Sequence, residues 1–260
     1  MSRVGGGCRD RTPVSILPES RLRNEEAADK IKKLLVPEGQ GGAVVVRPAT
    51  LTPTTTVPGR TVLFTSFVAA GLVPPFSAFF LQVLETYGIQ MAHLSPNSVV
   101  ALAVFAHLCE MFVGVMPSAT LLRHFFVLRP VGKKRGHSTA DVAGCCNLRL
   151  REGLGDHYIP QVMRSKWEEW RRDWFFVDID PHERLELPEK AAEPRRSTWE
   201  APPPEDARLK PVLERILELR EGGLTSVMVV VNFLRRRLAP LRERARPSWF
   251  YTGPKDITRT

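Results

Sequence analysis

The feature that most constrains this chain is one strongly apolar window. Within residues 61–130, 43 of 70 residues are hydrophobic, whereas the whole chain of 260 residues is 43% hydrophobic. A window of this density can supply a buried core, and a charged content of 25% fits a globular protein. Proline breaks a helix when it lies in the interior. The prolines of the window therefore predict short elements that begin and end at Pro74, Pro75, Pro96, Pro117 and Pro130.

Start and stop signals in the window predict three helices. The first covers residues 76–87 and ends at Gly88, a favoured C-cap residue. The second begins at Ser95-Pro96, where an N-cap residue precedes a proline at the first helical position, and it ends before Gly114. The third covers residues 118–128 and stops before a proline. Ahead of these helices, residues 61–67 fit a short strand or an extended lead-in.

The second predicted helix is apolar on nearly every side except for a stripe through His107 and Glu110. Both groups would need partners inside a bilayer, so the pattern favours a buried helix of a globular protein over a membrane span. We interpret the stripe as a polar seam or a mutual hydrogen bond rather than a two-ligand metal fragment. The first 13 residues contain no apolar stretch typical of a signal peptide. We therefore expect a soluble, intracellular protein of the cytoplasm or nucleus that does not contact a membrane.

After the window the pattern changes. Residues 146–151 alternate polar and apolar side chains, as does the stretch around Tyr158, which predicts a small β-hairpin with its turn at residues 152–156. Residues 166–177 fit a helix with three indoles on one face, which is more typical of a core than of a base-stacking surface. The three residues are Trp167, Trp170 and Trp174.

The C-terminal part is predicted to hold a linker and a pair of helices. Residues 181–207 are rich in proline, glutamate and arginine, which is typical of an extended linker. Residues 208–221 and 225–238 predict two helices joined by a turn at Gly222-Gly223. The valines within residues 227–231 leave a strand open as an alternative to the second helix.

Together these patterns predict a mainly α fold, with a compact helical core, a small β-hairpin, a C-terminal αα-hairpin and a disordered N-terminal arm. The arm, residues 1–59, is basic and rich in proline and glycine, and only residues 19–36 fit a short helix. The core domain covers residues 60–180 and is followed by the linker, 181–207. Residues 208–260 hold the helical hairpin and an arginine-rich tail.

The chain offers few residues for catalysis or metal binding. Four cysteines do not make a disulfide framework in a chain of this size, and the adjacent Cys145 and Cys146 cannot readily bridge each other because the ring is strained. Asp178 and Asp180 resemble a minimal metal-binding triplet, but they precede Pro181 and fit a turn or cap better. We therefore expect no enzymatic activity, no metal, no cofactor and no small-molecule substrate.

The positive charge of the chain points to a different class of partner. The net charge is +9, and the sequence pI is about 9.8. Clustered basic residues could contact a nucleic-acid backbone without sequence specificity, and the alternative is a solvated face that maintains solubility. The candidate nucleic-acid-binding residues are Lys133, Lys134 and Arg135 in a basic loop and Arg235, Arg236, Arg237, Arg242, Arg244 and Arg246 in the tail.

Several blocks of the chain occur in an order and spacing that can be compared with a known family. They are Val62–Phe67, Gly71-Leu72, Pro75-Phe76, Phe79-Phe80, Tyr87–Gln90, His93–Ser98, Leu108–Glu110, Phe112–Val115 and His124–Phe126. The pattern resembles the gypsy-type transposon domain of plant retrotransposon-derived proteins, over about residues 60–260 and most densely before residue 130. The resemblance implies the gag-side portion of such an element, for which no catalytic residues are assigned.

The sequence therefore favours a non-enzymatic, gag-like interaction protein that self-associates through apolar helical surfaces. The alternative is a transposase-derived nucleic-acid-binding module that uses the basic loop and the arginine-rich tail. A metal-dependent nuclease built on Asp178 and Asp180 is the least favoured of the three hypotheses.

Overall fold

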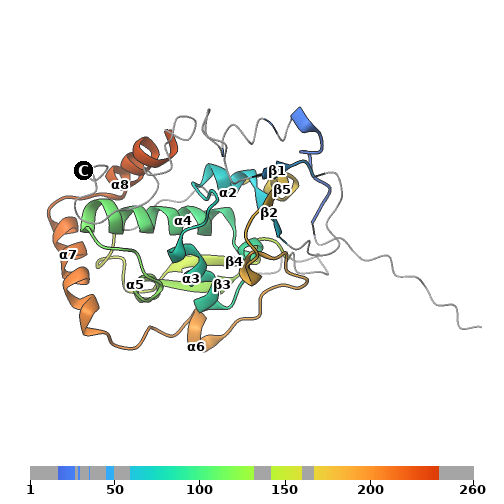
Figure 1. Ribbon diagram of the computed structural model, residues 1–260. Coiled ribbons are helices and arrows are strands. Elements are labelled where there is room, and N and C mark those ends of the chain that lie inside the picture. Colours follow the sequence, from blue (N-terminus) through green and yellow to red (C-terminus); the bar gives the residue numbers. More distant parts are fainter. Residues whose placement is uncertain are drawn as a thin grey trace, which may run out of the picture.

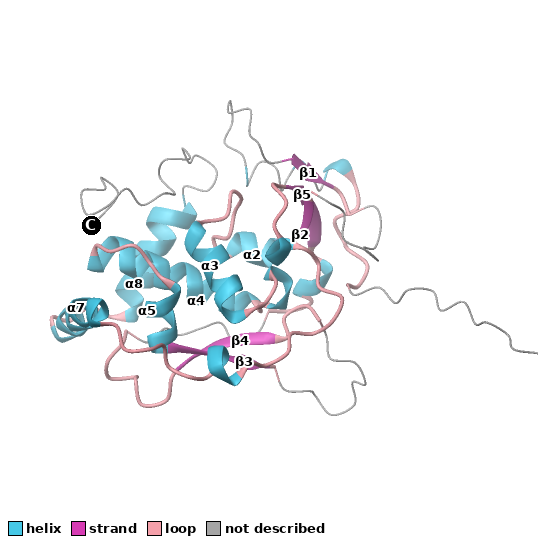
Figure 2. Ribbon diagram, turned by 60° about the horizontal axis from the view of Figure 1, so that its bottom comes forward, coloured by secondary structure: helices cyan, strands magenta, loops and turns pink. Residues whose placement is uncertain are grey.

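The computed structural model of the chain describes residues 17–26, 29, 35, 45–49, 59–131, 142–159 and 167–239. Their fold is mixed α/β, with helices and two small antiparallel sheets, so the expectation of a mainly α fold is corrected. Helix α4 crosses the middle of the molecule (Figure 1). The two-stranded sheet lies beside α4, and the three-stranded sheet lies at one end of the helical core (Figure 2).

The first two predicted helices of the apolar window form, with the predicted caps at Gly88, Ser95 and Gly114. Helix α3 (Ala78–Tyr87) begins where the Ser77 side chain accepts a hydrogen bond from a backbone N–H, and it ends at Gly88 with a φ of 65°. Helix α4 (Pro96–His107) begins with the same kind of cap at Ser95. The chain then continues as a π-helix (Leu108–Val113) that ends at a glycine with positive φ. A short helix, α2 (Thr65–Ala69), precedes them.

The third predicted helix is only partly correct. Helix α5 (Ala119–Phe125) ends three residues early, and the chain turns directly into strand β3 (Phe126–Pro130). Strand β3 pairs with β4 (Cys146–Leu150), from Phe126 opposite Leu150 to Pro130 opposite Cys146. The strand at residues 146–151 is therefore confirmed, but its predicted partner near Tyr158 is wrong. Tyr158 is buried instead, with its ring 4.6 Å from that of Phe125.

The second sheet corrects the helix predicted over residues 166–177. Glu169 has a φ of 44°, a 3₁₀ turn follows at Trp170–Arg172, and residues Trp174–Asp178 form strand β5. Strand β5 lies between β1 (Val45–Arg47) and β2 (Arg60–Phe64), antiparallel to both. Its first four side chains are all buried, as expected for a central strand with both faces covered.

The three tryptophans therefore do not share one helical face, and each makes a separate contact. Trp170 packs against Phe64 and Phe67, at ring-centroid distances of 4.8 and 5.8 Å. Trp167 donates a hydrogen bond to the Asn97 side chain, and Trp174 donates one to the carbonyl of Pro18. The last contact ties an N-terminal segment to the central strand.

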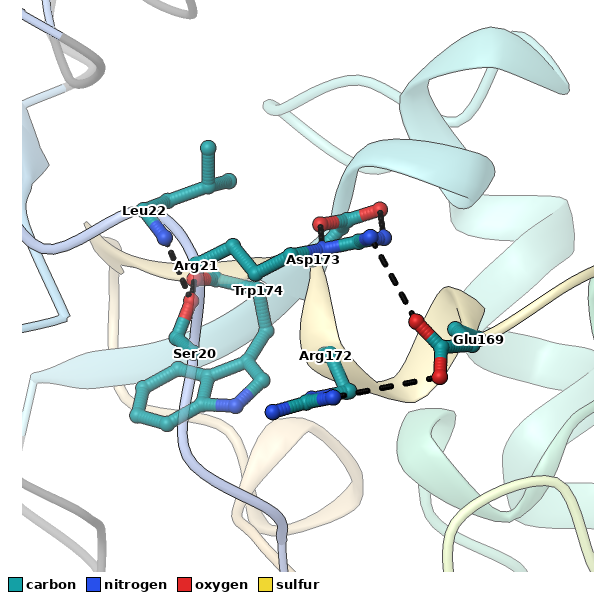
Figure 3. Close-up of polar contacts among 7 residues, drawn as sticks. All are labelled: Ser20, Arg21, Leu22, Glu169, Arg172, Asp173 and Trp174. Atoms are coloured by element: carbon teal, nitrogen blue, oxygen red, sulfur yellow. Dashed lines mark hydrogen bonds and ion pairs between the residues drawn. The ribbon is translucent and has the colours of Figure 1, made fainter.

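That N-terminal segment corrects the expectation of a disordered arm for part of residues 1–59. Ser20 is buried and its hydroxyl donates to the carbonyl of Trp174 at 2.6 Å, while Arg21 forms a two-bond ion pair with Asp173 (Figure 3). Leu17 is also buried, and β1 extends the sheet. The predicted helix at 19–36 is only partly correct, because residues 19–24 are not helical, residues 25, 26, 29 and 35 are, and the other eight lie outside the described residues.

The C-terminal third packs onto the core at several points along its described length. Within the predicted linker, Leu185, Leu187 and Trp199 are buried, so residues 181–207 are not a free spacer. This stretch includes a 3₁₀ turn (Glu183–Leu185) and helix α6 (Arg196–Trp199), whose Trp199 donates to the carbonyl of Tyr87. A further 3₁₀ turn (Ala207–Leu209) leads into helix α7.

The two predicted C-terminal helices are confirmed, but each packs mainly on the core instead of on the other, so they do not form the predicted hairpin. Helix α7 (Lys210–Glu221) is followed by α8 (Ser226–Phe233), which the Thr225 side chain caps and which continues as a π-helix (Leu234–Leu238). The alternative of a strand at residues 227–231 is thereby excluded. Helix α8 packs on α4, whereas α7 packs on the π-helix that follows α4 (Figure 1).

Candidate functional site

The predicted polar stripe on the central helix faces the C-terminal helix. The imidazole Nε2 of His107 lies 2.8 Å from the side-chain oxygen of Asn232 on α8. One turn further along, Glu110 forms an ion pair with Arg237 at 2.8 Å. The side chains of Glu110 and Arg237 are only 16% and 6% exposed. We call these four residues the polar seam, and they join two segments more than 120 residues apart in sequence.

Burial controls the charge of the seam. It lowers the pKa of His107 to about 4, an effect that the hydrogen bond from His107 to the side-chain oxygen of Asn232 opposes and that the nearby Arg237 and Arg236 reinforce. His107 is therefore neutral at physiological pH. Glu110 and Arg237 offset each other's charge, which is the condition under which charged groups are tolerated in an interior.

A cavity of about 140 Å³ opens beside the seam, between the loop before α3 and helices α3, α4 and α8. Most of its lining is apolar, and His107, Glu110 and Arg237 form its polar end. The apolar lining includes Leu72, Val73, Phe79, Phe80, Leu102 and Phe233. A cavity with this lining can accept an apolar group, and its charged pair is already mutually satisfied. Its geometry is that of a binding site rather than of an acid–base pair.

The structure separates the candidate nucleic-acid-binding residues. Arg235 and Arg236 are exposed at the end of α8, whereas Arg237 is 5% exposed and paired within the polar seam. The inclusion of Arg237 among surface residues that bind phosphate is therefore corrected. The reason is the helical rotation, which turns one of three consecutive arginines towards α4. The remaining candidates lie outside the described residues: Lys133, Lys134, Arg135, Arg242, Arg244 and Arg246.

An exposed apolar surface on α8 was not predicted from the sequence. Val227, Met228, Val231 and Leu234 are 66%, 54%, 37% and 46% exposed. Their spacing places them on the side of the helix opposite Val229 and Phe233, which are buried. We call these four residues the α8 stripe. The only sequence signal was the length of the apolar run, because a helix that packs on one face needs fewer apolar residues than residues 227–234 contain.

The two aspartates of the candidate metal-binding triplet belong to the sheet. Asp178 ends β5 and pairs with Arg47 at 2.8 Å and with Arg60 at 3.0 Å. Partial burial opposes ionisation of Asp178, but the hydrogen bonds from the two arginines outweigh it and lower the pKa of the carboxyl. Asp180 follows in the loop. Among the residues that the structure describes, no three His, Cys, Asp or Glu side chains gather as metal ligands would.

Comparison with known proteins identifies one part of the chain. Residues 62–130 match the family model described as "Putative gypsy type transposon", which covers α2 through β3. No curated protein and no solved structure matches the chain. In the described part of the chain, the continuous helix Pro96–Val113 is long and apolar enough to span a membrane, and 67% of it is buried within the fold. That burial is what a core helix shows, and it agrees with the sequence-based interpretation.

Proposed function

We propose that this chain, in which residues 62–130 carry a gypsy-type transposon domain, is a non-enzymatic, gag-like interaction protein that self-associates through the α8 stripe. The observation that carries the proposal is the exposure of four apolar side chains on one side of a helix. Contiguous exposed apolar surface is typical of protein–protein contact sites. We place the protein in the cytoplasm or nucleus, where its free cysteines stay reduced.

The polar seam supports this assignment because it fixes the orientation of α8. With His107–Asn232 and Glu110–Arg237 on the buried side, rotation of the helix would break two polar contacts and expose Phe233. The stripe is therefore presented on a preorganised surface, which lowers the ordering cost of association. Two copies can cover each other's stripe around a two-fold axis, because the same surface serves both partners.

The size of the stripe sets the expected strength. Burying a half-exposed valine, leucine or methionine contributes about 1 kcal/mol, and a symmetric pair buries eight such side chains. Association costs at least ~4 kcal/mol in lost translational and rotational freedom. The balance is at most about 4 kcal/mol, which corresponds to weak self-association with a dissociation constant of about 1 mM. Because the attraction is apolar, it persists at high salt.

Sedimentation of the full chain over a concentration series that reaches about 1 mM, at high salt, tests the proposal. The variant Val227→Asp/Met228→Asp should sediment as a monomer, because it places two charges in the stripe. The matched control is Val131→Asp/Met116→Asp, which alters two other exposed residues, 44% and 65% exposed, outside the stripe. A wild-type monomer throughout the series, or equal dissociation of both variants, would refute self-association through α8.

A second candidate function, a nucleic-acid-binding module, is favoured by the exposed Arg235 and Arg236 beside the stripe. Retardation of DNA or RNA in a gel should then weaken steeply as salt rises. Reversal of both charges with glutamate should lower the slope of log affinity against log salt by about 2, since each lost phosphate contact contributes about 1. The exposed Arg149 on β4, changed to Glu, is the matched control. Equal affinities of variant and control would show that the arginines only maintain solubility.

The non-enzymatic assignment can be overturned directly. Asp178 is held by two arginines, an environment that favours a structural role over metal binding. Cleavage of DNA or RNA that depends on a divalent metal and that is abolished by Asp178→Ala would establish the nuclease alternative.

A further inference from the structure

The two adjacent cysteines lie in a rigid segment at the start of β4. Gly144, just before them, has a φ of 73°, and its N–H donates to the carbonyl of Ala92 at 2.9 Å. A Cβ on Gly144 would lie 2.5 Å from the ring of Trp170, so the backbone approaches the indole more closely than any other residue type allows. This fixed backbone leaves Cys145 half-buried and buries Cys146 completely.

The surroundings of Cys145 favour a thiolate. Its Sγ lies 3.6 Å from that of Cys146, accepts a hydrogen bond from the backbone N–H of Ala192 at 3.4 Å, and has Arg171 nearby. The hydrogen bond from Cys146 is the largest influence; despite partial burial, these groups lower the pKa of Cys145 to about 7. The same contact and burial raise the pKa of Cys146, which stays a neutral thiol.

The contrast with Cys109 shows that this environment is local. Cys109 is completely buried, and burial raises the pKa of its thiol well above the usual range. Thiol reactivity follows thiolate character and access. Among the cysteines that the structure describes, these two conditions meet at Cys145.

We propose that Cys145 and Cys146 form a peroxide-reactive thiol pair, in which Cys145 is the nucleophile and Cys146 the resolving thiol. The Cys145 thiolate attacks one oxygen of hydrogen peroxide, the O–O bond breaks, and the departing hydroxide takes up a proton to become water. The product at Cys145 is a sulfenic acid. The Cys146 sulfur then attacks the Cys145 sulfur, the S–O bond breaks, and the leaving hydroxyl takes the Cys146 proton as a second water. Two thiols lose two electrons in total, and one peroxide gains them.

The position of the pair makes this oxidation reversible and couples it to the structure around α4 and the β3–β4 sheet. Ring strain disfavours bridging of adjacent thiols, but attack on a sulfenic acid releases water and drives the ring closed, and a strained disulfide is readily reduced again. The backbone around the pair is held in place: the carbonyl of Cys145 accepts from Val131, and that of Cys146 accepts from Ser95 at the N-cap of α4. Closing the ring therefore stresses the junction between α4 and the β3–β4 sheet.

Mass spectrometry of the full chain, treated at pH 7 with one equivalent of hydrogen peroxide, tests the proposal. We expect one intramolecular disulfide between Cys145 and Cys146, with the loss of two hydrogens and full reversal by dithiothreitol. In Cys146→Ser, a sulfenic acid should accumulate at Cys145 and be trapped by dimedone. Cys145→Ser should abolish the disulfide, whereas Cys109→Ser, the matched control, should leave it unchanged.

A second measurement needs no variant. In the folded wild-type chain, the alkylation rate of Cys145 should reach half of its maximum near pH 7. The value for the urea-unfolded chain should be near pH 8.5, so that at pH 7 the folded thiol reacts about tenfold faster. Equal rates in the folded and unfolded chains, or peroxide products at other cysteines with Cys145 unchanged, would overturn the proposal.

Discussion

The helical core and the three-stranded sheet of this protein differ in how far apart in sequence their interacting residues lie. Helices α3 and α4 each begin and end at residues that are adjacent to them in sequence, such as Ser77 and Gly88 around α3. The sheet joins strands at residues 45–47, 60–64 and 174–178, and its central strand also holds the segment around Ser20. Local signals therefore predict the first region, whereas the second forms only when distant segments meet.

The largest expected effect is the loss of the central indole of the sheet. Trp174 is 1% exposed and donates to the carbonyl of Pro18, so Trp174→Ala should lower the free energy of unfolding by about 3–5 kcal/mol. It should also remove hydrogen-exchange protection at Arg21 and Leu22. Their N–H groups donate to the carbonyl of Arg172 and to the hydroxyl of Ser20, and both hydrogen bonds depend on the attachment of the N-terminal segment. Urea denaturation and exchange measure the two effects.

The matched control for Trp174→Ala is Phe105→Ala in α4, where the ring is completely buried. It should cost a similar free energy of unfolding but leave the local protection of residues 21 and 22 intact. If both variants release the N-terminal segment equally, the sheet and the helical core are not separable in the way proposed.

The buried ion pair links the helical core to a segment far away in sequence, and it should give the next largest effect. Arg237→Met leaves Glu110 charged and buried, so the free energy of unfolding should fall by about 3 kcal/mol. The addition of Glu110→Met should restore most of that loss. The exposed Arg236, changed to Met, should cost less than ~0.5 kcal/mol. A similar small cost for Arg237→Met in urea denaturation would contradict the burial of this pair.

The polar seam should also make stability depend on pH. Because the pKa of His107 is about 4 in the folded state and near 6.5 when unfolded, the unfolded chain binds the proton more readily between these values. The stability from His107 is therefore complete above pH 6.5 and is lost as the pH falls towards 4, by up to roughly 3 kcal/mol.

Urea denaturation at several pH values, with His107→Gln alongside the wild type, measures this effect. The variant should show a shallower dependence between pH 6.5 and 4. It should retain part of the slope, since burial also lowers the pKa of His93. Parallel curves for the two proteins would mean that His107 is protonated in the folded state.

The smallest expected effect belongs to the local signals of the helical core. Ser77→Ala removes the side-chain acceptor for the N–H of Phe80, and it should cost about 1 kcal/mol in urea denaturation. Ser77→Asp keeps an acceptor at the N-cap and should retain most of the stability. A cost above that of Arg237→Met would reverse the ranking of local and distant contacts.

The candidate site shows the same division. The spacing of His107 and Glu110 on an apolar helix predicted the seam, but Asn232 and Arg237 could not be assigned as partners, because nothing in the sequence pairs residues so far apart. The sequence does not distinguish the consecutive arginines 235, 236 and 237, and only the folded helix shows that Arg237 is the buried one. The α8 stripe was missed for a related reason: an apolar run does not say which of its residues another helix will cover.

The sequence by itself determined the apolar window, the caps of its helices, the C-terminal helical pair and the family match over residues 62–130. These features depend on residues within a few positions of one another. Tertiary structure decided that residues 126–130 and 174–178 are strands, which residues of the N-terminal segment join the sheet, and which arginine is buried. A strand needs hydrogen-bond partners from elsewhere in the chain, and a buried charge needs its counter-ion, so neither is fixed until the distant segments meet.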